Sequence, residues 1–217
     1  MTAKIKLNAA SGGGSFSLQA PSSSSNNRVL TLPDSADGTI AKTSDINYVK
    51  LQALQSSDPV SSITFSSLDV TTYRTFKLIF TGIPTTDATS LAFRFMVDGT
   101  GQAENQYHWG NLGVTNAGAV FDSALQQTAG RIAGGAGSDD QEGWTFELTV
   151  LPHVSGDPTF RNNFAYSQNV RFNSSNLYRG ESFWLRYKTN VATNGFKIYA
   201  DSGNIDNYSY TLYGLTR

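Results

Sequence analysis

The chain has 217 residues, enough for one sizeable β domain or for a domain with an appendage. Its 16 Lys and Arg nearly balance its 17 Asp and Glu, and only 15% of residues are charged, so the composition argues against electrostatic attraction to nucleic acid or to anionic membranes. The absence of cysteine excludes a disulfide framework and a thiolate metal site.

The N-terminal sequence MTAKIKLNAASGGG lacks the apolar core of a signal peptide. No apolar run approaches the length that spans a membrane. We therefore expect a soluble protein that is made without an export signal and does not insert into membranes.

Residues 1–46 differ in composition from the rest and are predicted to form an N-terminal arm. Their one aromatic residue is Phe16, and Gly, Ser and Asn separate short apolar pieces. These pieces are Ile5 with Leu7, Phe16 with Leu18, and Leu30 with Leu32. Such a segment buries too little apolar area to offset its ordering entropy, so it is either a disordered tail or an arm that orders against another surface. The spaced apolar pieces favour the second alternative, because a linker has no need of them.

The same arm leads us to expect a homotrimer. A single apolar row on a short strand is marginally stable in water. Three copies around a three-fold axis can cover one another's rows, and Gly12 to Gly14 allow the chain to bend between layers. The alternative is that a capsid surface covers the rows without any symmetry of the protein itself.

From Tyr48 onward, alternating apolar residues predict β-strands. Phe76, Leu78 and Phe80 alternate with other residues, a turn-forming segment follows at 82–87, and alternation resumes at Leu91. We predict that these two runs form antiparallel strands joined as a hairpin. Further rows follow to the end of the chain, and no window of similar length has the pattern of an amphipathic helix.

We expect residues 47–217 to form an all-β domain of roughly eight to ten strands, a jelly-roll-like two-sheet β-sandwich. One shared core is predicted from the strongest rows. Its members are Phe76, Leu78, Phe80, Leu91, Phe93, Phe95, Trp144, Phe146, Leu148, Phe196 and Ile198.

The sequence offers little for catalysis. Its two histidines, His108 and His153, are too few for a multi-histidine metal site. The acidic turn 139–142 has the chemistry of a calcium site, but a solvated turn is the commoner explanation. The glycine-rich stretch 130–137 does not match a phosphate loop, since no lysine follows at the required place, and we interpret it as a mobile loop. We expect no enzyme activity, no cofactor and no metal.

Binding has somewhat more support. Tyr107, His108 and Trp109 lie between asparagines, a combination suited to stacking on sugar rings. Burial in the sandwich core is the stronger interpretation for Trp109. Trp184 lies between Phe183 and Leu185, so if those two face the core, it points outward or into a neighbouring subunit. Our surface-binding candidates are Tyr107, His108, Trp109 and Trp184.

The arm also carries a resemblance to a known group of proteins. The phrases LNAASGGGSFSLQAPSS and LTLPDSADGT, at residues 7–23 and 30–39, resemble the N-terminal arm of virion proteins from marine tailed phages, including phages that infect cyanobacteria. FKLIFTGIPTTDATSLAFRFMVDG and the closing YSYTLYGLTR are similar to the β-sandwich module attached to that arm. The resemblance covers nearly the whole chain and includes no catalytic residues.

The resemblance implies a non-enzymatic virion protein, mostly of the tail-fibre type and usually trimeric. Phages assemble in the host cytoplasm and leave by lysis, which agrees with the missing signal peptide and disulfides. Its partners would be itself, other tail or capsid proteins and a host surface polysaccharide. The alternatives are a capsid decoration protein bound through its arm, and a carbohydrate-binding or depolymerising module.

Overall fold

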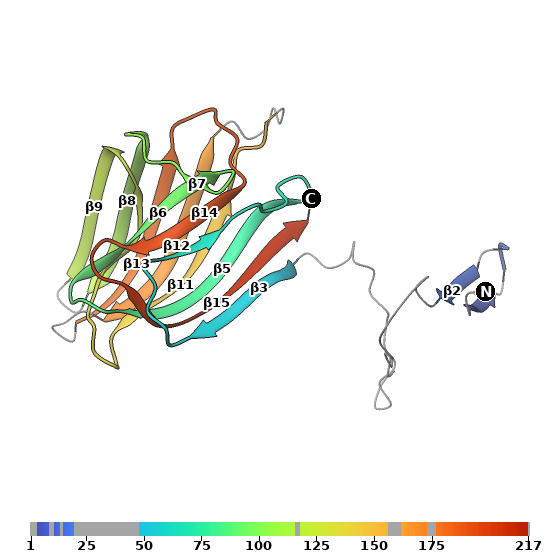
Figure 1. Ribbon diagram of the computed structural model, residues 1–217, viewed down its shortest axis with the longest axis horizontal. Coiled ribbons are helices and arrows are strands. Elements are labelled where there is room, and N and C mark those ends of the chain that lie inside the picture. Colours follow the sequence, from blue (N-terminus) through green and yellow to red (C-terminus); the bar gives the residue numbers. More distant parts are fainter. Residues whose placement is uncertain are drawn as a thin grey trace. The chain divides into compact units, whose positions relative to one another are not determined.

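All regular elements in the computed structural model are β-strands (Figure 1). The structure describes residues 4–8, 11–13, 15–19, 48–115, 118–155, 162–172 and 177–216, and these residues contain no helix. The chain divides into two compact units, residues 1–41 and 42–217. The predicted all-β fold class, a two-sheet sandwich, is confirmed.

The N-terminal unit contains a hairpin of short strands. Strand β1 (Lys4–Asn8) pairs antiparallel with β2 (Ser15–Gln19), and the register places Ile5 opposite Leu18 and Leu7 opposite Phe16. The side chains of Ile5 and Leu7 are exposed, at 63% and 59%. Leu30 and Leu32, and the predicted boundary after residue 46, lie outside the described residues.

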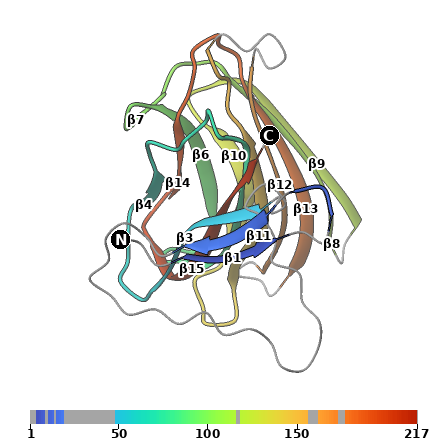
Figure 2. The ribbon, with the colours of Figure 1, turned by 90° about the vertical axis from the view of Figure 1, so that its right-hand side faces the viewer.

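The second unit is built from two antiparallel sheets that pack face to face (Figure 2). The small sheet has five strands in the order β10-β6-β14-β4, with β7 paired to β6. These strands are β4 (Ser62–Phe65), β6 (Thr89–Val97), β7 (Thr100–Gly101), β10 (Gly130–Ala136) and β14 (Gly195–Ala200).

The large sheet has eight strands in the order β3-β15-β5-β11-β12-β13-β8-β9. They are β3 (Tyr48–Ser56), β5 (Tyr73–Pro84), β8 (Tyr107–Thr115), β9 (Gly118–Gln127), β11 (Gly143–Leu151), β12 (Asn163–Phe172), β13 (Tyr178–Tyr187) and β15 (Ile205–Thr216). The sandwich therefore has more strands than expected, because the weakly patterned β9 and the glycine-rich β10 are strands as well.

The core lies between the sheets, and every residue of the predicted core set belongs to it. In the large sheet, the register places Phe146 opposite Phe80, and their rings stack with centroids 4.8 Å apart. In the small sheet, Phe93 and Phe196 stack at 5.6 Å. Aromatic pairs at such distances stabilise the fold beyond the area that they bury.

The predicted hairpin between residues 74 and 98 is wrong. Strand β5 lies in the large sheet and β6 in the small sheet, so the two do not pair with each other. Phe80 of β5 and Phe93 of β6 both belong to the core between the sheets. Alternation correctly predicted which residues of each strand are buried, but two strands on opposite sides of a core show the same alternation as two strands in a hairpin.

The interpretation of the glycine-rich stretch 130–137 as a loop is also wrong. Residues 130–136 form β10, which pairs with β6 at the edge of the small sheet. Its register with β6 shifts between Arg131 and Ala133 and again between Ala133 and Ala136. Glycines are needed in this strand because other groups approach its backbone closely, most of all the Arg171 guanidinium at Gly134.

We predict that replacing Phe93 by alanine will lower the free energy of unfolding by ~3–5 kcal/mol, because it opens a cavity among fully buried rings. Leu125→Ala is the matched control, since that side chain is 67% exposed on β9 and should change stability by less than ~1 kcal/mol. Urea denaturation of both variants measures the difference. Equal losses would contradict the placement of the core.

Candidate functional site

The predicted binding segment at residues 107–109 does not form one surface patch. Tyr107 is fully buried and is therefore not a surface-binding residue. Its hydroxyl accepts a hydrogen bond from the Phe95 amide at 2.9 Å and donates to the Gln102 carbonyl at 3.1 Å. Burial raises the pKa of the Tyr107 phenol well above its usual range. Strand alternation explains the correction, because neighbouring residues point to opposite faces of the sheet.

The other candidates are divided between the two faces of the large sheet. Trp109 is half-buried and packs against the core, with the Arg131 guanidinium 4.8 Å from its ring centroid. His108 alternates with Trp109, and its register partner on β13 is the exposed Arg186. Trp184 is 51% exposed and points away from the core. Whether any of these residues binds a ligand stays a prediction.

Strand β12 has the opposite polarity from the one expected in a sandwich. Its buried positions are Asn163, Ala165, Ser167, Asn169 and Arg171. Its exposed positions are Phe164, Tyr166, Gln168, Val170 and Phe172. An antiparallel sheet with one solvated face normally places the apolar row inside. Here mostly polar groups face the sandwich interior and mostly apolar groups face outward.

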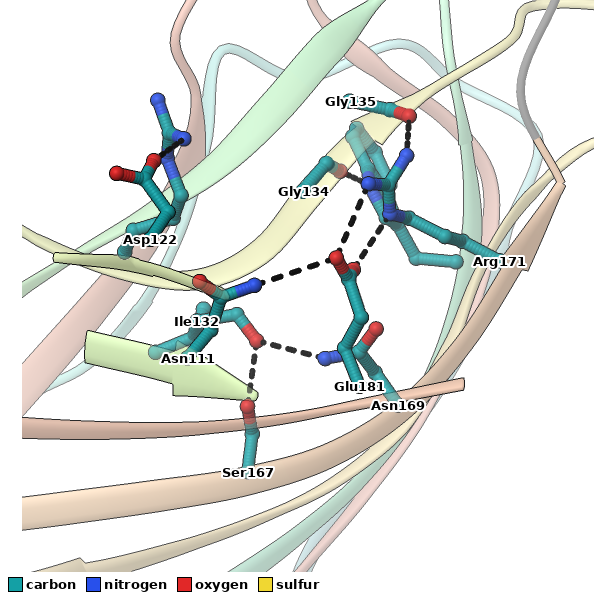
Figure 3. Close-up of polar contacts among 11 residues, drawn as sticks. Asn111, Asp122, Ile132, Gly134, Gly135, Ser167, Asn169, Arg171 and Glu181 are labelled. Carbon is teal, nitrogen blue, oxygen red and sulfur yellow. Dashed lines mark hydrogen bonds and ion pairs between the residues drawn. The ribbon is translucent and has the colours of Figure 1, made fainter. Parts of the chain in front are cut away.

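Ser167, Asn169, Arg171 and Glu181 form a buried polar cluster, and the ion pair between Arg171 and Glu181 is its centre (Figure 3). Both side chains are at least nine-tenths buried. Arg171 Nε donates to Glu181 Oε2 at 2.7 Å, and Arg171 Nη2 donates to Glu181 Oε1 at 3.2 Å. Arg171 Nη1 also donates to the Gly135 carbonyl, and Asn111 Nδ2 donates to Glu181 Oε1 at 3.3 Å. The carboxylate and the guanidinium are thus both paired and hydrogen-bonded, as buried charges require.

Further polar side chains connect the large sheet to the backbone of β10. The Ile132 carbonyl accepts hydrogen bonds from Ser167 Oγ and, at 3.3 Å, from Asn169 Nδ2 (Figure 3). The Gly134 carbonyl accepts from Trp144 Nε1 at 2.9 Å. Because β10 lies at the edge of the small sheet, carbonyls on its free side would otherwise lack partners. The polar row of β12 supplies part of what they need.

A cavity of about 500 Å³ adjoins this cluster. Its charged and amide-bearing lining residues are Asn111, Asp122, Arg131, Arg171, Arg179 and Glu181. Asp122 Oδ2 lies 3.6 Å from Arg131 Nη1, a loose ion pair between partly exposed side chains. This site was not predicted from the sequence. The sequence did contain a signal for this site. Asn169 and Arg171 alternate with Val170 and Phe172, and an apolar core has no need of such a polar row.

At the end of the large sheet that carries this cavity, the exposed face of the sheet is apolar. We define the outer apolar patch as Leu112, Val114, Phe121, Val170, Phe172 and Tyr178, all exposed. The register places Val170 opposite Gly180, Gly180 opposite Val114, and Leu112 opposite Phe121, so β12, β13, β8 and β9 present them on one face. A hollow of about 870 Å³ crosses these strands and is lined by Leu112, Val114, Val170, Gln168 and Glu147, among others.

A second feature of this face is an aromatic pair. Tyr166 and Trp184 are direct cross-strand partners on β12 and β13, and both are exposed. On the far side of Trp184 its partner is Gly110, which has no side chain to cover the indole ring. Adjacent exposed aromatic rings with amide and hydroxyl groups nearby, here Gln168 and Ser182, suit stacking against sugar rings.

The acidic turn at 139–142 is closed by its own hydrogen bonds. The Glu142 amide donates to the Asp139 carbonyl at 2.8 Å, and Glu142 Oε2 accepts from the Asp139 amide at 3.1 Å. In the part of the chain that the structure describes, no three His, Asp or Glu side chains gather as a metal site would require.

We predict that Gly134→Ala will destabilise the protein by ~1–3 kcal/mol, because an added Cβ would lie 2.4 Å from Arg171 Nη2. The guanidinium cannot easily move, since its hydrogen bonds to Glu181 and Gly135 hold it. Gly110→Ala is the control, because the nearest atom to its Cβ would be 3.6 Å away. Thermal unfolding followed by circular dichroism should show a clear loss for Gly134→Ala alone. Equal melting temperatures would contradict the close packing of β10.

Comparisons with protein-family models, with curated proteins and with solved structures found no match to this chain. Among the described residues, no helix is long and apolar enough to cross a membrane.

Proposed function

We propose that this chain is a non-enzymatic structural protein of a tailed-phage virion, a short tail fibre or fibre-tip adhesin that acts as a homotrimer. The resemblance of the arm and of the sandwich module to marine phage proteins supports the virion assignment. The observation that carries a role in assembly is the outer apolar patch.

The patch is unusual for a surface that stays in water. Polar side chains normally cover the solvated face of an antiparallel sheet, and large contiguous apolar patches mark interaction sites. The six patch residues expose on the order of 600 Å² of side-chain surface, judged from the size of such side chains and their exposed fractions. A standard interface takes ~800 Å² from each partner, so the patch is large enough to form the apolar centre of one.

The partner that we assign to the patch is another copy of the chain. Self-association would bury Val170, Phe172 and their neighbours in every subunit at once, whereas a monomer would expose them. The trimeric state itself comes from the resemblance, since the virion proteins that the chain resembles are usually trimers. The stability of the sandwich would then depend on protein concentration.

The arm is proposed to join the trimer to the rest of the particle. In the β1–β2 hairpin, Ile5 and Leu7 are exposed and need a surface to cover them. A tail or capsid protein can supply that surface, so a capsid decoration protein is the alternative assignment. The aromatic pair Tyr166 and Trp184, which lies outside the patch, favours the adhesin, because a decoration protein has no need of a sugar-binding surface.

We predict that Val170→Glu will convert the trimer into monomers, because a carboxylate in the middle of the patch cannot be buried without a partner. The side chain points outward, so the fold should be retained. Thr64→Glu is the control, since Thr64 is exposed on the small sheet. Size-exclusion chromatography with light scattering should give three copies for the unaltered chain and for Thr64→Glu, and one for Val170→Glu. A monomeric unaltered chain would contradict the proposal, and a dimer would contradict its symmetry.

Deleting residues 1–46 should leave a folded sandwich that no longer enters virions, because the core cluster found among the described residues lies entirely in the second unit. Circular dichroism tests the fold, and an incorporation assay with phage particles tests the attachment. Normal incorporation of the shortened protein would rule out the arm as the attachment element. Immunogold labelling of intact particles would separate a fibre tip from a capsid position.

A further inference from the structure

We propose that the cavity between β8, β9, β13 and β10 binds a small hydroxylated anion, of which an acidic sugar is the example that fits best. The anionic group would be a carboxylate, sulfate or phosphate held by Arg179 and Arg131. This site lies on the interior side of the large sheet, and of the outer apolar patch only Phe121 also lines it. It does not depend on the chain being a virion protein.

The charges that line the cavity do not cancel. Arg171 and Glu181 neutralise each other through two hydrogen bonds. Asp122 forms one loose ion pair, 3.6 Å long, with Arg131, and accepts a hydrogen bond from the uncharged Ser123 amide at 2.8 Å. Arg179 is left as a cation without a counter-ion among the described residues. The lining thus carries one excess positive charge.

Arg179 is the least expected member of this lining. The register places it directly opposite Arg171 on β12, so two guanidinium groups are cross-strand neighbours. Like charges in that position destabilise a sheet, and a bound anion would relieve the repulsion. Arg179 Nε is buried and has no hydrogen-bond partner in the described part of the chain. In the sequence, the residues that connect β8 to β9 (116–117) and those at 173–176 between β12 and β13 include no Asp or Glu.

Arg131 is positioned to act with Arg179. Its guanidinium lies 4.8 Å from the centroid of the Trp109 ring, a contact that restricts its position. A guanidinium has five N–H donors, so the long contact with Asp122 leaves donors for a ligand. Arginines bind planar or tetrahedral oxyanions through charge-assisted hydrogen bonds.

Asn111 supplies the reason to expect hydroxyl groups on the ligand. Its Nδ2 donates to Glu181, which fixes the orientation of the amide because the opposite orientation would set oxygen against carboxylate. Asn111 Oδ1 is buried and has no donor among the described residues. A ligand hydroxyl can supply that donor. The volume of about 500 Å³ is within the range of small-molecule sites and can hold a monosaccharide unit.

Isothermal titration calorimetry of the full chain with sodium glucuronate, sodium sulfate and glucose, at constant ionic strength, tests the proposal. We expect glucuronate to bind, sulfate to bind more weakly and glucose not to bind. Sulfate binding as tight as glucuronate binding would support the anion site and overturn the part assigned to Asn111. Binding of none of the anions, or equal binding of glucose, would overturn the proposal as a whole.

The glucuronate affinity of substituted chains tests whether the ligand binds in this cavity. Arg179→Gln should weaken glucuronate binding by about tenfold or more, since a hydrogen bond to a charged group is lost. Arg179→Lys keeps the charge and should retain part of the affinity even if Arg179→Gln fails to fold. Arg186→Gln is the control, because Arg186 is exposed on the opposite face of β13. Unchanged affinity in both Arg179 variants, or an equal loss in Arg186→Gln, would overturn the assignment.

Discussion

The buried ion pair between Arg171 and Glu181 is the interaction on which the polar end of this sandwich depends. Breaking such a pair by removing one partner costs ~3–5 kcal/mol, because the other charge is left unpaired in the interior. Here Arg171 also donates to the Gly135 carbonyl, so the same guanidinium connects the large sheet to the edge strand of the small one. The pair therefore fixes both the charge balance of the interior and the position of β10.

The ion pair has a consequence on the other side of the sheet. Side chains alternate strictly along a strand, so a row of polar residues inside β12 places the intervening row outside. That intervening row holds Phe164, Tyr166, Val170 and Phe172. Polar groups inside need hydrogen-bond partners, and apolar groups outside are best covered by another surface. The interior polar row of β12 and its apolar outer row, which adds Val170 and Phe172 to the outer apolar patch, are thus two results of one arrangement.

Alternation in the sequence predicted well which residues of the core are buried, but it predicted poorly which strands pair with each other. Phe93 and Phe146 were placed in the core correctly, since a long apolar row has one stable location. The pairing of β5 with β6 was predicted incorrectly, because alternation is the same for strands in one sheet and for strands that face each other. The polarity of β12 was missed for a different reason, since an apolar row is normally assigned to the core and here the polar row is the buried one. The glycines of β10 were misinterpreted because the close approach of Arg171 to Gly134 is a tertiary contact.

The buried polar cluster lies near the place where the small sheet stops covering the large sheet. The large sheet has eight strands, and the main path of the small sheet has four, ending at β10. Strand β10 lies mainly against β13 and β12, so β9 extends beyond the covered part and solvent reaches the interior there through a cavity. An apolar lining at this place would be exposed, whereas Arg179, Arg131 and Asn111 tolerate water and can bind a solute from it. The difference in width between the two sheets is therefore the physical reason why this end of the sandwich is suited to holding a ligand.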